Sequence, residues 1–142
     1  MKIVNFGSVN IDYVYTVPHF VRPGETLAAV RRDIFPGGKG LNQTTALTRA
    51  LGKASGIEIC IAGGIGKNDG AILKQAIIDM NVDKALLGEY DAPSGHALIQ
   101  VDASGQNSII YYAGTNKMQT KDFIDGVLAH FSKGDFIVLQ NE

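Results

Sequence analysis

The sequence predicts an α/β fold, with a mostly parallel sheet flanked by helices and a small antiparallel β-sheet that protrudes from it. Three observations lead to this prediction. Short apolar runs end at glycine or polar residues, segments with helical spacing lie between them, and four further segments mix polar with apolar residues. The first two patterns are typical of strand–helix units that build a parallel sheet, and the third indicates a sheet with one face in water.

Three apolar runs are expected to form the buried parallel strands. They are Lys2–Phe6, Ile57–Ala62 and Phe136–Leu139. Continuous apolar runs of this length suit strands that are covered on both faces. Glycine follows the first run at Gly7 and the second at Gly63, which indicates a turn at the end of each strand.

Three segments with apolar residues three or four positions apart are predicted to form helices. Leu41–Leu51 precedes Gly52, which is expected to end it, and Asp69–Met80 precedes Asn81. In Thr120–Phe131 the threonine is a natural N-cap, and three apolar side chains, those of Phe123, Val127 and Phe131, line one face. Helices placed between the strands require crossover connections, so the strands are expected to run parallel.

The half-polar segments are expected to form the protruding antiparallel sheet, which we call the lid. They are Asp12–Val17, Leu27–Phe35, His96–Val101 and Asn107–Tyr112. A sheet in this position could cover a ligand at the strand ends. We therefore predict one domain over residues 1–142, with an α/β body formed by 1–11, 36–92 and 113–142 and a lid formed by about 12–35 and 93–112.

Composition excludes several classes of protein. The chain has 142 residues, a formal net charge of -1 and a single cysteine. The near-neutral charge gives no reason to expect nucleic acid or an anionic membrane as a partner, and one cysteine cannot form an internal disulfide. No signal peptide or membrane-spanning apolar stretch is evident, so we expect a cytoplasmic protein. The three histidines are isolated and no metal-ligand spacing occurs, so no metal site is expected within the chain.

The glycine-rich segment Gly37–Gln43 is the first candidate for ligand binding. The phosphate-binding pattern GxxxxGK[ST] fails here because Asp33 stands where its first glycine belongs. Glycines followed by a helix can nevertheless bring backbone N–H groups close to a ligand, while Lys39 supplies a cation and Asn42 both a donor and an acceptor. The alternative is a tight strand-to-helix turn without a ligand.

Polar residues that follow buried strands are the second group of candidates. Asn10 and Asp12 come shortly after the first strand, and Glu142 comes shortly after the last one. The carboxyl ends of parallel strands meet at one rim, where ligands bind in open α/β sheets. Carboxylates that accept from neighbouring hydroxyls, together with carboxamides, are suited to a polyol. An Asx-type turn cap is the alternative explanation for Asn10 and Asp12.

The motifs of this chain resemble, in order, those of the ribokinase (PfkB) family of carbohydrate kinases. The resemblance runs over the whole chain, and the GGKGxNQ block is its most specific part. The matching segments are GSVNID at 7–12, FPGGKGLNQ at 35–43, GGIGKNDG at 63–70, PSGHALIQVD at 93–102, YYAGTN at 111–116 and LQNE at 139–142.

The resemblance implies a ribokinase-like fold, here its front half, with a lid over a sugar. It implies that the sugar is contacted by nine residues: Asn10, Ile11, Asp12, Gly38, Lys39, Gly40, Leu41, Asn42 and Glu142. It further implies ATP with Mg²⁺ as the phosphoryl donor, K⁺ as activator, and D-ribose as the substrate phosphorylated at O5. A homodimer could form through the lid, with Ile110 and Tyr112 as contacts, although packing of the lid within one chain is an equal alternative.

The family's second signature, DTxGAGD, does not occur in these 142 residues. Its final aspartate is the family's catalytic base, so no catalytic residue is assigned in this chain. We expect the chain to be the sugar-binding part of a longer kinase and to be inactive alone. The alternatives are a relative that acts on a nucleoside, fructose or another sugar, and a non-catalytic module for sugar binding or dimerisation.

Overall fold

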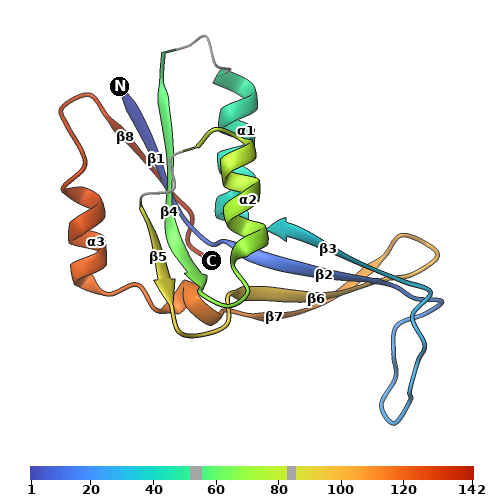
Figure 1. Cartoon of the computed structure of the whole chain (residues 1–142). Helices are drawn as coiled ribbons and strands as arrows, with labels where there is room; N and C mark the ends of the chain where they lie inside the picture. Colours follow the sequence, from blue (N-terminus) through green and yellow to red (C-terminus); the bar gives the residue numbers. More distant parts are fainter. Residues whose placement is uncertain (52–55, 83–85) are drawn as a thin grey trace.

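A computed structural model describes residues 1–51, 56–82 and 86–142 (Figure 1). The chain forms a body of strands and helices from which a long, narrow sheet extends. In chain order the elements are β1 (Lys2–Phe6), β2 (Asn10–Thr16), β3 (Arg31–Gly37), α1 (Lys39–Leu51), β4 (Glu58–Gly66), α2 (Ala71–Asp79), β5 (Leu87–Tyr90), β6 (Gly95–Val101), β7 (Asn107–Tyr112), the 3₁₀ helix η2 (Gly114–Lys117), α3 (Lys121–Leu128) and β8 (Phe136–Leu139).

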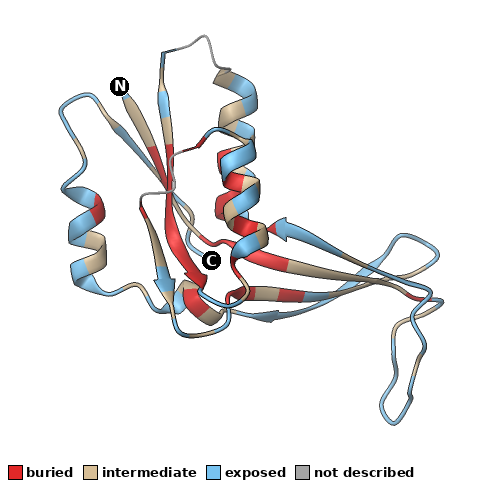
Figure 2. Cartoon of the chain, viewed as in Figure 1, coloured by how far each residue is buried: buried red, intermediate tan, exposed pale blue. Residues whose placement is uncertain are grey.

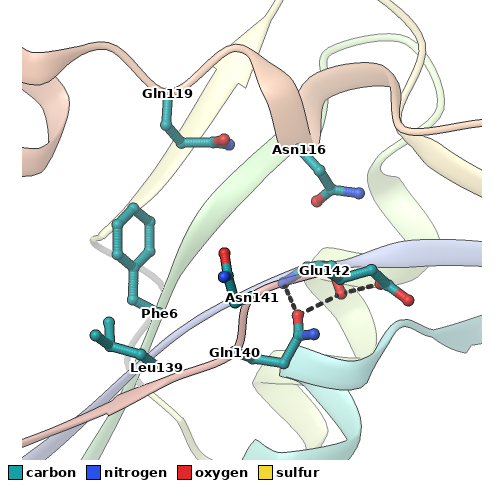
Figure 3. A pocket seen from close by; sticks show the side chains of 9 residues that line it. Phe6, Asn116, Gln119, Leu139, Gln140, Asn141 and Glu142 are labelled. Atoms are coloured by element: carbon teal, nitrogen blue, oxygen red, sulfur yellow. Dashed lines mark hydrogen bonds between the residues drawn. The ribbon is translucent and has the colours of Figure 1, made fainter.

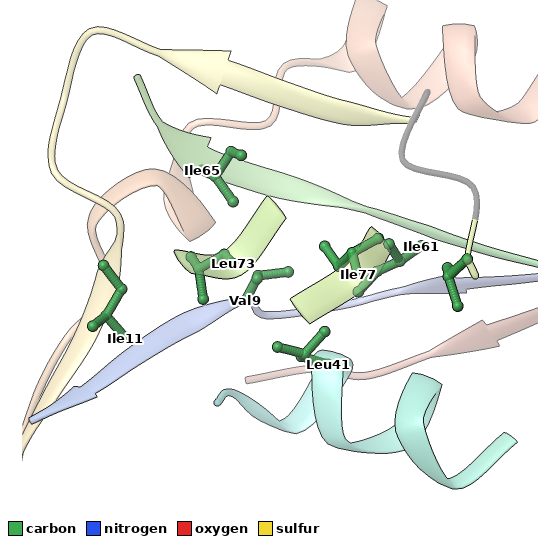
Figure 4. Packing of buried hydrophobic residues seen from close by; sticks show 8 residues of the cluster. Val9, Ile11, Leu41, Ile61, Ile65, Leu73 and Ile77 are labelled. Atoms are coloured by element: carbon green, nitrogen blue, oxygen red, sulfur yellow. The ribbon is translucent and has the colours of Figure 1, made fainter. Parts of the chain in front are cut away.

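The body contains a parallel sheet in the order β5-β4-β1-β8, as predicted for this part of the chain. One hydrophobic cluster joins strand residues such as Ile61 and Ile65 to Leu41 of α1 and Leu73 of α2 (Figure 4). A second cluster joins Val127 of α3 to the other side of the sheet, through Val4, Cys60 and Ala62. The inner strands β1 and β4 therefore have helices on both faces. The prediction that Phe136–Leu139 is buried is wrong for this chain, because β8 is an edge strand and its Phe136 and Leu139 are 58% and 65% exposed.

The lid is a mixed sheet in the order β3-β2-β6-β7, which corrects the prediction of a purely antiparallel one. The outer pairs β2/β3 and β6/β7 are antiparallel, but the central strands β2 and β6 run parallel. The reason is geometric. β2 follows β1 and β6 follows β5, and both of these body strands end at the same rim. Each central lid strand therefore starts at that rim and runs outward in the same direction (Figure 1).

The predicted element ends are confirmed where local chemistry sets them. Thr120 caps α3, and its side chain accepts from the Phe123 N–H at 3.2 Å. Asn81 has a φ of 57°, and the next N–H, that of Val82, donates to the Ile77 carbonyl at 3.2 Å. This pattern is the Schellman ending of a helix. Gly52, the expected end of the first helix, lies outside the described residues.

Other boundaries differ from the prediction. The second lid strand begins at Arg31 rather than at Leu27, and the body strand after Ile57 continues to Gly66. The four-residue strand Leu87–Tyr90 was not predicted, because its apolar character is too weak and too short to be told from a loop. None of the helices in the described part of the chain combines the length and the apolar character needed to cross a membrane.

Candidate functional site

A cavity of about 410 Å³ lies at the rim of the body sheet, beneath the inner face of the lid. It brings together five of the side chains predicted from the sequence, although they come from β2, α1 and the segment after β8. The lining residues are Asn10, Asp12, Gly38, Lys39, Asn42, Ala97, Ile99, Ile109, Tyr111 and Glu142. The expectation that Asp12, Lys39 and Asn42 share one surface agrees with this geometry.

The glycine turn before α1 is held against the end of β1. Gly38 has a φ of +93°, and a Cβ there would lie 2.8 Å from the backbone N of Asn10 and from the Ser8 carbonyl oxygen. The buried Asn5 side chain of β1 donates from Nδ2 to the Gly40 carbonyl at 2.6 Å. Glycine is therefore required at position 38 both for the backbone conformation and for the close approach. The result is that Lys39 and Asn42 enter the cavity from the first turn of α1.

A second glycine leaves room for the Asp12 carboxylate. Gly37 ends β3 beside Asp12 of the neighbouring strand, and a Cβ at position 37 would overlap the Oδ2 atom of Asp12. Burial and, to a smaller extent, the negative charge of Glu142 raise the pKa of Asp12. The surroundings of Asp12 therefore disfavour its ionised form, and carboxylates with a raised pKa in a cavity are typical of functional sites.

Glu142 is the best-bonded carboxylate of the cavity. It accepts from the Lys39 ammonium and from the Ser8 hydroxyl at 2.5 Å. Burial on its own raises the pKa of Glu142, but the hydrogen bonds from Lys39 and Ser8 bring it below its ordinary value. The hydrogen bond to Glu142 in turn raises the pKa of Lys39. The lowered pKa favours the ionised form of Glu142, and the hydrogen bonds hold its carboxylate in place.

Three of the residues predicted to contact sugar, Ile11, Gly40 and Leu41, do not line the cavity. Ile11 and Leu41 are each 2% exposed and belong to the hydrophobic core (Figure 4). Gly40 packs against the backbone of Gly7 and Ser8, where a Cβ would lie 2.6 to 2.7 Å from backbone atoms. These three residues shape the site through the backbone and the core, and their side chains do not line the cavity.

The prediction missed the apolar half of the cavity, which the lid supplies. Ala97 and Ile99 of β6 and Ile109 and Tyr111 of β7 point to the same face. Their spacing of two residues was a usable signal, because alternate side chains of a strand share a face. Ser8, which donates to Glu142, was also missed as a site residue.

A second cavity, of about 480 Å³, opens on the other side of Glu142 (Figure 3). Its lining includes four carboxamides and consists of Phe6, Gly7, Ser8, Asn116, Gln119, Leu139, Gln140, Asn141 and Glu142. Gln140 accepts from the Ser8 backbone N–H at 3.3 Å and thereby joins the segment after β8 to the loop after β1. Glu142 therefore stands between two open spaces at the rim.

The segment Gly63–Gly70 connects the body to the start of β6 through hydrogen bonds. Asp69 accepts from the Ser94 hydroxyl at 2.6 Å, and the Gly66 N–H donates to the Ser94 oxygen at 2.8 Å. Ser94 immediately precedes β6, so these bonds fix the root of the lid to the body. Within residues 1–51, 56–82 and 86–142, no group of three or more His, Cys, Asp or Glu side chains could hold a metal ion. We therefore assign no residue to Mg²⁺ or K⁺.

The candidate site is thus a polyol-sized space with acceptors, donors and an apolar cover. Carboxylates and carboxamides can pair with several hydroxyls at once, and Ile99 and Ile109 can lie against the C–H face of a ring. Phosphoryl transfer would additionally require groups that stabilise charge on the phosphates.

Comparison with known proteins agrees with the fold. The chain matches the pfkB family carbohydrate kinase model over residues 1–141. The ribokinase of Haemophilus influenzae is 33% identical over 137 residues, which cover 96% of this chain and 44% of that protein. The deoxyribokinase of Salmonella typhi is 31% identical over 145 residues, which cover 100% of this chain and 45% of that protein.

Solved structures show the same relation. The ribokinase of Cryptococcus neoformans in complex with ADP is 34% identical and superposes with a TM-score of 0.76 over 99% of this chain and 40% of its own. The Arabidopsis thaliana ribokinase complexed with ribose and ATP is 26% identical, with a TM-score of 0.71 over 87% of this chain and 41% of its own. The chain spans less than half the length of these relatives. The chain belongs to the pfkB family of carbohydrate kinases.

Proposed function

We propose that this chain is the sugar-binding part of a kinase that transfers a phosphoryl group from ATP to O5 of D-ribose. The observation that carries the proposal is the convergence of Asn10, Asp12, Lys39, Asn42 and Glu142 on one cavity under the lid. All five polar groups can form hydrogen bonds to hydroxyls, and a site built to bind hydroxyls rejects analogues that lack them.

The likeness to the Haemophilus influenzae ribokinase supports ribose as the substrate. The Salmonella typhi deoxyribokinase is similar to this chain over the whole length of the chain. We therefore propose 2-deoxy-D-ribose as the second candidate substrate. The two sugars differ in one hydroxyl. A polar group of the cavity that pairs with the 2-hydroxyl would lose its partner in the deoxy sugar, which discriminates between them.

The chemistry of transfer is proposed to depend on residues beyond this chain. The relatives solved with ADP, or with ribose and ATP, support ATP as the donor. We propose that the catalytic base and the groups that hold the phosphates lie in the part of the relatives that this chain does not span, so that the chain alone is inactive. Activation by Mg²⁺ and K⁺ and a cytoplasmic location stay predictions.

Pairing of two chains through the lid also stays a prediction, and one feature supports it. Leu98 and Ile110 lie on the lid face opposite the sugar cavity, where they line a shallow groove of about 270 Å³. Both side chains are exposed, as is Tyr112 at the root of β7. Exposed apolar side chains grouped on one face of a sheet are typical of an interface with another copy.

A binding experiment tests the proposed function on this chain directly. The amide spectrum of the ¹⁵N-labelled chain would be followed by NMR during titration with D-ribose, 2-deoxy-D-ribose, D-fructose and adenosine, and separately with ATP. We expect D-ribose to shift signals from Asn10, Asp12 and Asn42 at the lowest concentration, and ATP to shift none of them. Tighter binding of adenosine or fructose than of ribose would overturn the assignment to ribose.

A further inference from the structure

A chain of side-chain amides connects the end of the lid to the candidate cavity. The Val9 backbone N–H donates to Oδ1 of Asn116, in η2, at 3.1 Å. Nδ2 of Asn116 donates to Oδ1 of Asn10 at 2.6 Å, and Asn10 lines the same cavity as Glu142, whose pKa its carboxamide helps to lower. Asn116 does not line the 410 Å³ cavity itself, but it contacts Asn10, which does.

We call the hydrogen-bonded series Val9–Asn116–Asn10 the relay. The chemistry of the Val9 N–H decides which atom donates and which accepts in each of its hydrogen bonds. A backbone N–H can only donate, so the Asn116 oxygen must face Val9 and its NH₂ group must face Asn10. Asn10 therefore turns its oxygen toward Asn116. The hydrogen bond from Asn116 therefore sets the orientation of Asn10. The ionised Glu142 can only accept, so a neighbouring NH₂ group of Asn10 suits it as well.

The surroundings hold the two carboxamides side by side. A Cβ at Gly95 would overlap both Nδ2 of Asn116 and Oδ1 of Asn10, so the two carboxamides fill the space above this glycine. Asn10 is itself a buried residue. A buried carboxamide with this partner cannot turn over without losing the hydrogen bond.

We infer that Asn116 is a positioning residue that holds Asn10 so that it presents N–H donors, and no acceptor, to the sugar cavity. The inference rests on the proposed function and deepens it. In this arrangement Asn10 supplies hydrogen-bond donors to the sugar and Asp12 supplies acceptors. A sugar hydroxyl accepts from Asn10, and the carboxylate of Asp12 accepts from a sugar hydroxyl.

The test replaces the donor of Asn116 and preserves its shape. In Asn116→Asp the oxygen that faces Val9 is retained, but nothing donates to Asn10, so Asn10 turns its oxygen toward the cavity. We expect D-ribose to bind the 142-residue chain about tenfold more weakly, as for the loss of one hydrogen bond. Binding is measured by the NMR titration described above.

Gln119→Glu is the matched control. It makes the same chemical change three residues further along, at a side chain that donates to the Thr115 carbonyl at 2.8 Å and lines only the second cavity. We expect its affinity for ribose to equal that of the unchanged chain. An equal loss in both variants would overturn the inference, because the added charge alone would then explain the effect.

A second readout does not depend on the sugar. If the NH₂ group of Asn10 faces Glu142, Glu142→Gln shifts the Asn10 side-chain amide signals in the unchanged chain, and shifts them much less in the Asn116→Asp background. Unmoved signals in the unchanged chain would overturn the relay. If ribose changed no signal, only the assignment to ribose would be refuted, because the Asn10 side-chain signals test the relay without sugar.

If Asn116→Asp does not fold, Asn116→Ser replaces it. Serine is uncharged and too short to reach both Val9 and Asn10.

Discussion

The body and the lid of this chain differ sharply in how much of each is buried. In the body, β4 is buried without interruption from Cys60 to Gly66, whereas in the lid every residue of β7 is exposed (Figure 2). Several buried residues of the lid sheet, among them Asn10, Ile11 and Ala97, lie near its root, and Val17 is buried at its far end. The lid therefore depends on the body, because a sheet with so little buried area gains little hydrophobic stabilisation of its own.

This difference separates stability from recognition. The clusters that stabilise the fold are in the body, on the two faces of its sheet. The candidate cavity lies between the two regions, with polar groups from the rim on one side and apolar lid residues on the other. Changes in the body should therefore act on unfolding, and changes at the rim should act on binding.

The largest expected effect is the loss of a core side chain from the body. Ile61→Ala, at a residue that is 0% exposed, should lower the free energy of unfolding by about 2 to 5 kcal/mol. The matched lid variant Ile110→Ala, at a residue that is 64% exposed, should change it by about 0.5 kcal/mol or less. Urea denaturation followed by circular dichroism measures both. Equal losses would show that the lid stabilises the fold as much as the body does.

Removal of the Asp12 carboxylate should be the next largest effect, and it should act on binding. Asp12→Ala is expected to weaken D-ribose binding by about 1.5 to 3 kcal/mol, the cost of losing a charged hydrogen-bond partner. Asp33→Ala is the control, because Asp33 pairs with Arg31 at 2.7 Å on the outer lid strand, away from the cavity lining. Calorimetric titration of both variants with ribose provides the measurement. An unchanged affinity in Asp12→Ala would remove Asp12 from the site.

A methyl group at Gly37 should disturb the same carboxylate indirectly. In Gly37→Ala the new Cβ would overlap the Asp12 carboxylate, so Asp12 must move and ribose should bind about tenfold more weakly. Gly126→Ala in α3 is the control, since a Cβ there meets no atom within 4 Å. It should leave binding unchanged and stabilise the body by about 0.5 to 1 kcal/mol, because alanine favours a helix. Equal ribose affinities in the two variants would contradict this role of Gly37.

The smallest expected effect concerns the charge of Asp12 and its dependence on pH. Because the pKa of Asp12 is raised in the folded chain, ionisation of Asp12 costs stability, and the full cost is present above the raised pKa. Asp12→Asn should therefore be more stable than the unchanged chain at pH 7. The advantage should shrink as the pH falls through the raised pKa toward the ordinary pKa of an aspartate. Urea midpoints at pH 7, 6, 5 and 4 measure it. A less stable variant at pH 7 would contradict the prediction.

The sequence predicted the body better than the lid, for reasons that particular elements show. The apolar runs Lys2–Phe6 and Phe136–Leu139 have the predicted bounds, and the caps at Thr120 and Asn81 are present because their causes are local. The parallel pairing of β2 with β6 is not local. It depends on two separate connections that leave the same rim, and no pattern within either strand records it.

The same division applies to the site. The identity of its polar groups could be read from the sequence, because carboxylates, carboxamides and a lysine follow strand ends and glycines, and those positions meet at a rim. Tertiary structure alone determined which of these groups face the cavity and which pack into the core. Ile11 and Asp12 are adjacent in the chain, yet one is in the core and the other lines the cavity. Alternation along a strand separates the two side chains, but only packing against the body decides which face of the lid is covered.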